Sequence, residues 1–241
     1  QWVMIENSPR RPVPAGTLGS LARALDPGRA GRLLLLAGPP LVLDLGASLA
    51  GPVLLRGRKV LFVDGANTFN PYILTRLADQ AGQEPRAVLE RLMISRTFTV
   101  HQLEALVCDH LLRAIDRHDP GLVVLSGWST LFHDENVPQA EAMRLLQSTA
   151  DAARRLAASG APILGTHAEE PRTPRLAPLR AVLARAATAV VRLDRDEGVV
   201  RISLEKPGTL AGFRPLQIPE DRLLPIVGKG PHDIGPAMHP W

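Results

Sequence analysis

Short apolar runs that alternate with longer amphipathic segments are the feature that most constrains the fold of this chain. The runs that read as buried strands are Leu33–Leu36, Lys59–Gly65, Met93–Arg96, Leu122–Ser126 and Pro162–Thr166. The segments between them carry apolar residues at helical spacing and comprise Leu41–Leu49, Pro71–Ala81, Val100–Ile115 and Pro138–Ala158. Strands separated by helices predict an α/β fold with a mainly parallel sheet and right-handed crossovers.

The C-terminal part of the pattern is different, because two alternating segments flank an Asp-Glu-Gly turn. Ala189–Asp194 and Gly198–Glu205 are typical of an antiparallel β-hairpin. The sequence has no internal repeat and no boundary that indicates a second domain. We therefore expect a flexible lead-in at residues 1–17, one core domain at 18–218 and a Pro/Gly-rich tail at 219–241.

Composition limits the environment and the partners. The formal net charge is +4, and Arg supplies nearly all of the positive charge, which suits phosphate contacts but also accompanies GC-rich coding. Cys108 is the only cysteine, so an intrachain disulfide is excluded and a reducing cytoplasm is expected. The stretch Leu33–Leu55 is long enough to cross a bilayer, but three prolines interrupt it and Asp44 would lie in the lipid, so we expect no membrane span.

Small and polar residues stand where the expected strands end. Ligands of parallel α/β sheets bind at the carboxyl ends of the strands. In this chain those ends carry Gly38, Asp64, Ser126 and Thr166. The sequence therefore places a candidate site at this edge of the sheet.

Three segments share the pattern of one known family. Residues 18–31 read L-G-S-L-A-R-A-L-D-P-G-R-A-G, residues 63–71 read V-D-G-A-N-T-F-N-P, and residues 95–102 read S-R-T-F-T-V-H-Q. They resemble T-G-S-x-x-L-D-x-L-L-x-G-G-I-x-x-G, I-D-T-E-G-T-F-R-P and A-R-A-F-N-x-x-H-Q, the corresponding segments of RecA superfamily recombinases of the archaeal RadA and eukaryotic branch. The order and spacing of the three carry the resemblance over about residues 18–218. It implies a RecA-like P-loop NTPase-type core whose closing strands form the hairpin.

The phosphate-binding loop departs from that family. A P-loop wraps phosphates with backbone N–H groups, reaches them with a Lys and holds Mg²⁺ with a hydroxyl. The eight residues from Gly38 read G-P-P-L-V-L-D-L, which puts Asp44 in the lysine position and Leu45 in the hydroxyl position. The two prolines have no N–H to donate, and a carboxylate repels a polyphosphate.

The other nucleotide-site positions depart as well. Relative to the family, Ala66 replaces the water-activating glutamate, Ser126 replaces the aspartate that supports Mg²⁺, and Thr166-His167-Ala168 stands where the family has T-N-Q. Phosphoryl transfer depends on stabilisation by Lys and metal, so the resemblance implies a pseudo-ATPase without catalytic residues, metal or cofactor. Its vestigial nucleotide pocket would comprise Gly38, Asp44, Leu45, Asp64, Ala66, Ser126 and Thr166.

The family places two loops along DNA, and both are reduced here. The first, His133–Pro138, is short and acidic, and the second, Glu169–Pro178, is shortened. The candidate phosphate contacts in and beyond the second loop are Arg172, Arg175, Arg180 and Arg185. A solvated helix face explains these arginines as well.

Single residues leave further alternatives open. Asp64 is interpreted as a strand-end carboxylate that caps the next turn, in preference to a leftover metal ligand. Trp128 is interpreted as packing or an interface anchor in preference to a platform for bases. Asp44 has two kinds of partner open to it, an arginine of a neighbouring subunit or an intrachain one such as Arg56 or Arg58.

The leading hypothesis is a non-catalytic RecA-like recombinase paralogue that binds DNA, single- or double-stranded, or a recombinase partner, with a homo-oligomer as a further possibility. It would be cytoplasmic, and nucleoid-associated if it binds DNA. One alternative is an ATPase whose phosphate site is rebuilt from Arg56, Arg58 or Lys59. The other is a structural subunit of a complex unrelated to DNA.

Overall fold

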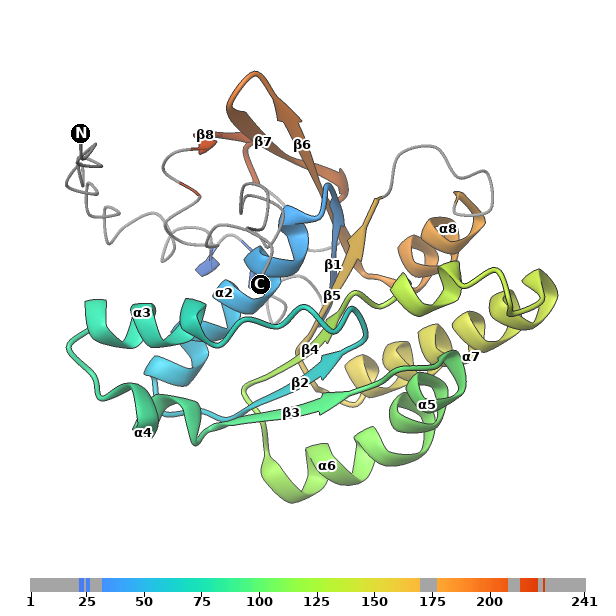
Figure 1. The fold of residues 1–241 in the computed structure, drawn as a ribbon, viewed down its shortest axis with the longest axis horizontal. Helices are drawn as coiled ribbons and strands as arrows, with labels where there is room; N and C mark the ends of the chain where they lie inside the picture. The colour runs from blue at the N-terminus through green and yellow to red at the C-terminus, as the bar shows by residue number, and fades with distance from the viewer. Residues whose placement is uncertain are drawn as a thin grey trace, which may run out of the picture.

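The computed structural model describes residues 22–23, 25–26, 32–169, 177–207, 213–220 and 223. It is an α/β structure in which an eight-stranded sheet of order β3-β2-β4-β5-β1-β6-β7-β8 separates two layers of helices (Figure 1). The strands are β1 (Leu33–Gly38), β2 (Val60–Asp64), β3 (Leu92–Arg96), β4 (Leu122–Ser126), β5 (Ile163–Ala168), β6 (Ala189–Asp196), β7 (Val199–Lys206) and β8 (Leu216–Pro219). The first six are parallel, whereas β7 is antiparallel to both β6 and β8.

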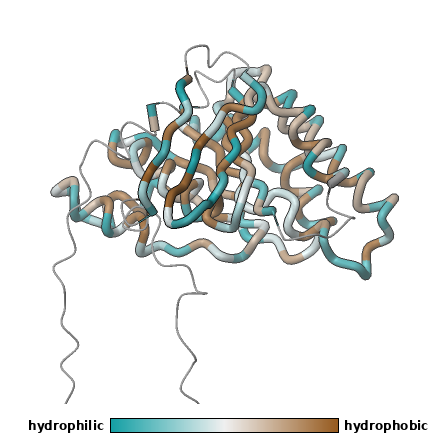
Figure 2. Tube along the Cα trace, turned by 90° about the horizontal axis from the view of Figure 1, so that it is seen from above, coloured by the Kyte–Doolittle hydropathy of each residue, from teal (hydrophilic) through white to brown (hydrophobic). Residues whose placement is uncertain are grey.

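The central strands β1, β2, β4 and β5 are buried along their whole length because both faces of the sheet are covered there. In β1, Leu34 and Leu36 pack on one face, against α2 (Leu41–Leu55), α3 (Tyr72–Gln80) and α4 (Pro85–Leu89). Leu33 and Leu35 pack on the other face, against the remaining helices. Hydrophobic stretches accordingly lie mainly in the middle of the molecule and hydrophilic ones mainly at its periphery (Figure 2).

The second face is covered by α5 (Val100–Ala105), α6 (Leu111–His118), α7 (Gln139–Ala158) and α8 (Ala177–Ala186). A π-helical turn, Leu106–His110, joins α5 to α6 in one helical stretch. The whole helical stretch agrees with the helix expected over Val100–Ile115. The hydrophobic pattern of the sequence gives no sign of the π turn.

Several expected bounds differ from the observed ones. Helix α2 continues to Leu55 past Gly51 and Pro52, since nine of its residues are buried against the sheet and α3. The helices α4 and α8 and the strand β8 were not expected as elements, and β5 extends to Ala168. The hairpin is confirmed as β6 and β7. The lead-in at 1–17, and the tail at 219–241 apart from Pro219, Glu220 and Leu223, lie outside the described residues.

The apolar stretch Leu33–Leu55 is divided by the turn after Gly38 into strand β1 and a 15-residue helix. Within the described part of the chain, no helix combines the length and the apolar character that a bilayer crossing requires.

Candidate functional site

The strand ends singled out in the sequence meet along one edge of the sheet, the carboxyl edge. Strands β2, β4, β5 and β1 are consecutive neighbours. Asp64 lies opposite Ser126 in the β2–β4 pair, and Thr166 lies opposite Leu36 in the β5–β1 pair. Gly38, Asp64, Ser126 and Thr166 are therefore brought together as expected, at the edge where parallel sheets bind ligands.

The connection from β1 to α2 is too short to enclose a phosphate. Strand β1 ends at Gly38 and helix α2 begins at Leu41, so Pro39 and Pro40 are the whole link. The N–H of Val42 donates to Pro39 O at 2.9 Å and that of Leu43 to Pro40 O at 3.0 Å. Two prolines without N–H groups, and two N–H groups already bonded within the turn, remove the donors that a phosphate cradle requires.

The positions that would hold Lys and a hydroxyl lie inside α2. Leu45 is fully buried in the core beneath the sheet. Asp44 is half-buried in the first turn, and burial raises the pKa of its carboxyl to about 6, while the Arg76 charge acts to lower it. Neither proposed intrachain partner lies close, because Arg56 and Arg58 follow the other end of the helix; Arg58 pairs with Asp119 instead.

Asp64 organises the turn that follows β2. Its carboxylate accepts hydrogen bonds from the N–H groups of Thr68 at 3.3 Å and Phe69 at 3.2 Å, and Arg96 Nε lies 3.5 Å from Oδ2. The side chain is fully buried. The interpretation of Asp64 as a capping carboxylate is confirmed.

The turns after β2 and β4 close tightly on each other. The Gly65 N–H donates to Ser126 O at 2.9 Å, and a Cβ on Gly127, whose φ is +59°, would lie 2.5 Å from the Ala66 Cβ. The Gly127 N–H in turn donates to Thr166 Oγ1 at 2.8 Å. Protein atoms thus fill the space between Ala66 and Thr166, two positions of the expected pocket.

Trp128 packs beneath this closed edge. It is 1% exposed, its Nε1–H donates to Thr149 Oγ1 at 3.0 Å, and its ring covers Gly165 of β5. This burial confirms packing as the role of Trp128 and leaves no face of the ring for a base.

Ser129 and His167 form a buried pair near the same edge of the sheet. Ser129 Oγ lies 2.6 Å from His167 Nδ1, and both residues are buried. Burial lowers the pKa of His167 to about 4, against the opposing charge of Glu169, so the imidazole is neutral at neutral pH. Because Ser129 is fully buried, the pair acts as an internal hydrogen bond and presents no nucleophile to a substrate. Within the described ranges, no three His, Cys, Asp or Glu side chains gather as a metal site.

His167 makes the stability of the protein depend on pH. Between the folded pKa of about 4 and the ordinary value of 6.5, the unfolded chain binds a proton that the folded chain does not. We therefore expect His167 to reduce the free energy of unfolding by up to about 3 kcal/mol as the pH falls through this window. Urea unfolding followed by circular dichroism at several pH values measures the change.

Asp44 acts in the opposite direction and supplies the control. Its folded pKa of about 6 exceeds the ordinary 3.8, so between these values the folded chain holds the additional proton, and stability falls as the pH rises. In Asp44→Asn the loss of stability on acidification should become steeper. In His167→Gln stability should instead increase on acidification, and an unchanged pH profile in His167→Gln would contradict the assignment.

The four arginines that were candidates for DNA contact do not lie together in the described part of the structure. Arg180 pairs with Glu169 at 3.0 Å and also with Glu205, so it is neither a solvated face nor an available phosphate contact. Arg185 is exposed in the last turn of α8, near the edge where the strands begin. Arg172 and Arg175 lie outside the described residues.

A cavity of about 350 Å³ adjoins the β1–α2 turn, lined by Pro39, Pro40, Glu169, Arg192, Leu193, Asp194 and Arg195. Its cations are already neutralised: Arg192 makes two hydrogen bonds to Glu169, at 2.9 and 3.1 Å, and Arg195 pairs with Glu220 at 2.7 Å. The cavity therefore offers no uncompensated positive charge to a polyphosphate.

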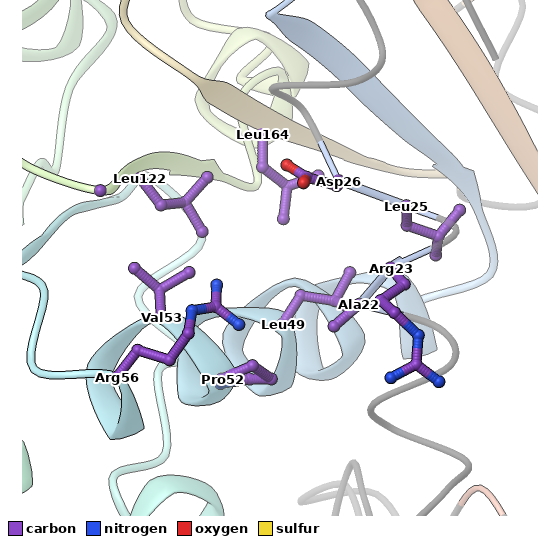
Figure 3. Close-up of a pocket in the computed structure, with 11 residues that line it drawn as sticks. Ala22, Arg23, Leu25, Asp26, Leu49, Pro52, Val53, Arg56, Leu122 and Leu164 are labelled. Carbon is purple, nitrogen blue, oxygen red and sulfur yellow. The ribbon is translucent and has the colours of Figure 1, made fainter.

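A second cavity, of about 340 Å³, lies at the opposite edge of the sheet, where the strands begin (Figure 3). It is bounded by the C-terminal half of α2 and by the first residues of β4 and β5. Its lining comprises Ala22, Arg23, Leu25, Asp26, Leu49, Pro52, Val53, Arg56, Gly121, Leu122 and Leu164. Sequence reasoning missed this cavity, because nothing in the local pattern indicates that residues 22, 23, 25 and 26 lie beside the C-terminal half of α2.

No protein family model matches the chain. No curated protein matches it either. The resemblance to the RecA superfamily therefore rests on the three sequence segments alone.

Proposed function

We propose that the chain is a non-catalytic RecA-like recombinase paralogue that acts by binding DNA, a recombinase partner or both, in recombination or repair. The observation that carries the proposal is the β1–α2 junction. Two prolines form the entire link, the N–H groups of Val42 and Leu43 are bonded within the turn, and a carboxylate takes the lysine position. A core of this topology without a phosphate cradle supports a role in binding and not in turnover.

The contact between two of the family-like segments also supports the proposal. Residues 63–71 form the end of β2 and its turn, and residues 95–102 form the end of β3 and the start of α5. The Thr97 N–H donates to Asp64 O at 3.3 Å, and Asn67 Nδ2 donates to Thr97 O at 2.8 Å. Two segments that resemble one family in sequence are thus also hydrogen-bonded to each other in the fold.

The residues suggested for a rebuilt phosphate site lie at the other edge of the sheet. Arg56, Arg58 and Lys59 precede β2, so they lie at the edge opposite Asp64 and Ser126. They cannot complete a pocket at the carboxyl edge.

We predict that calorimetry with Mg-ATP will detect no binding to the wild-type protein, even at nucleotide concentrations of about 1 mM. The Asp44→Lys variant, which restores the family's charge, should not bind either, because the missing backbone donors are not restored. A micromolar dissociation constant for the wild type would contradict the proposal.

The binding role needs its own test. A RecA-type recombinase from the same organism, and DNA, should be offered separately to the purified chain, with complex formation followed by size-exclusion chromatography and fluorescence anisotropy. Binding to one or both is the expected result. Failure to bind either, with an intact fold by circular dichroism, would favour a structural subunit unrelated to DNA.

A further inference from the structure

The turn Arg56-Gly57-Arg58-Lys59, which joins α2 to β2, places three cations in four exposed residues at the edge where the strands begin, the amino edge. Arg58 Nη2 lies 3.5 Å from Asp119 Oδ2, but both side chains are largely exposed, and such pairs contribute little. Among the residues that the structure describes, Arg56 and Lys59 form no ion pair. We call residues 56–59 the basic turn.

The cavity of about 340 Å³ opens beside the basic turn. Leu49, Pro52 and Val53 of α2 and Leu122 and Leu164 of the strands give it apolar walls. Figure 3 shows the Arg56 guanidinium turned back over Val53 toward the space between α2 and the strands, while Arg23 points away from that space. Gly121 lets the chain before β4 pack closely against the basic turn, since a Cβ there would lie 2.9 Å from the Arg58 Cβ. A cavity with apolar side chains on its walls and a cation at its mouth fits a flat ring attached to a phosphate.

Further cations follow the same edge. Each stands near the end of a helix or directly before a strand. They are Arg32, Arg91, Arg117, Arg155 and Arg185. Acidic residues also occur at this edge: Asp119 Oδ2 lies 3.5 Å from Arg58 Nη2, Glu90 Oε1 lies 3.2 Å from Arg86 Nε, and both pairs are largely exposed. Asp26 lines the cavity and is the one carboxylate that a phosphate entering it would have to avoid. Cations near helix C-termini are also explained by the helix dipole, which accounts for stability but not for the cavity beside the basic turn.

We infer that the amino edge, centred on the basic turn and its cavity, binds single-stranded nucleic acid. The cations would hold successive phosphates, and the cavity would take one unstacked base. A duplex fits less well, because its bases are paired and stacked and cannot enter a side cavity. The inference rests on the DNA-binding part of the proposed function and locates it on the edge opposite the vestigial nucleotide pocket.

The carboxyl edge is the competing location, and its charges oppose it. Arg180, Arg192 and Arg195 are paired with Glu169, Glu205, Asp194 and Glu220. A phosphate there would have to displace a carboxylate from each arginine. At the basic turn, Arg56 and Lys59 are available without such a displacement.

Fluorescence anisotropy with labelled oligothymidylate of about 20 nucleotides tests the inference. We expect Arg56→Glu/Lys59→Glu to weaken binding at least about tenfold and to flatten the salt dependence by about one to two counterions. The matched control is Arg113→Glu/Arg144→Glu, which changes the net charge equally on exposed positions of α6 and α7 and should retain affinity within about twofold. Equal weakening by both pairs, or no binding by the wild type, would overturn the inference.

Two further measurements identify the ligand that binds and distinguish a failure of the amino-edge site from a failure of the proposed function. Oligothymidylate should bind more tightly than an equal-length duplex and than thymidine monophosphate; equal affinity for the monophosphate would overturn the assignment to a strand. Leu49→Trp, which fills the cavity, should weaken oligonucleotide binding, and its fold is checked by circular dichroism. If the basic-turn variant still binds DNA as the wild type does, the amino-edge site is wrong while the proposed function stands. If neither DNA nor recombinase binds, both are wrong.

Discussion

Replacing Gly38 by Ala is expected to lower the free energy of unfolding by about 3–5 kcal/mol. Gly38 ends β1 with φ +151°, a conformation that side chains rarely adopt. A Cβ there would lie 2.4 Å from the carbonyl oxygen of Leu193 in the neighbouring strand β6, and a backbone atom of a central strand cannot move aside cheaply. The Gly38 carbonyl also accepts the Glu169 N–H at 2.7 Å, so a shift would propagate to β5. Urea unfolding of the purified variant measures the loss.

Gly82→Ala is the matched control for Gly38→Ala. Gly82 also has a positive φ, +66°, but nothing lies within 4 Å of the position that a Cβ would take. Its substitution should therefore cost only the backbone term, about 1 kcal/mol. Equal losses in the two variants would show that the contact with Leu193 is not what requires glycine at the end of β1.

The close approach at Gly38 bears on function as well as on stability. The residue that a P-loop would use to begin a wide turn here holds β6 against β1, and Pro39 and Pro40 then lead directly into α2. The same glycine thus serves strand packing where the family resemblance implies phosphate binding. On the proposed function, the tight turn therefore opposes phosphate binding in addition to the side chains at Asp44 and Leu45.

Hydrophobic periodicity was sufficient to predict the framework. The runs ending at Gly38, Asp64, Ser126 and Thr166 are all strands, and they are apolar on both faces because both faces are covered. Because the strands were expected to be parallel, these four residues were expected at one edge of the sheet, where ligands bind in such folds. The observed strand pairing places them there.

Features that depend on long-range contacts escaped sequence reasoning. The Ser129–His167 hydrogen bond joins residues 38 positions apart, and neither side chain has a local signal. Arg180 was expected at the surface, but Glu169, which follows β5, and Glu205 of β7 both pair with it. Helix α2 continued past Gly51 because that glycine lets Leu77 of α3 approach closely, a packing role that local propensity does not show.

The basic turn illustrates a further limit. Arg56, Arg58 and Lys59 are adjacent in sequence, and their charge alone suggested a phosphate site. Only the topology shows that a turn before a parallel strand lies at the edge opposite the turn that follows it. Charge in the sequence gives the chemistry of a surface, and strand direction decides which surface it is.

Truncation of the buried indole in Trp128→Ala is expected to lower the free energy of unfolding by about 3–5 kcal/mol. The indole is 1% exposed in the core between the sheet and α7, so its removal leaves a large cavity. It also removes the Nε1–H donor that bonds to Thr149 Oγ1 at 3.0 Å. Thermal or urea unfolding followed by far-UV circular dichroism measures the effect.

A second substitution identifies the contact responsible. A Cβ on Gly165 would lie 2.8 Å from the Trp128 ring, so Gly165→Ala should be destabilising by about 1–3 kcal/mol in the wild type. In the Trp128→Ala background that contact is gone, and the added methyl would partly fill the cavity, so Gly165→Ala should become nearly neutral. Additive losses in the double variant would mean that the ring does not rest on β5 at Gly165. Non-additivity would instead show that the indole and the bare backbone of Gly165 form one packing unit directly beneath the closed carboxyl edge.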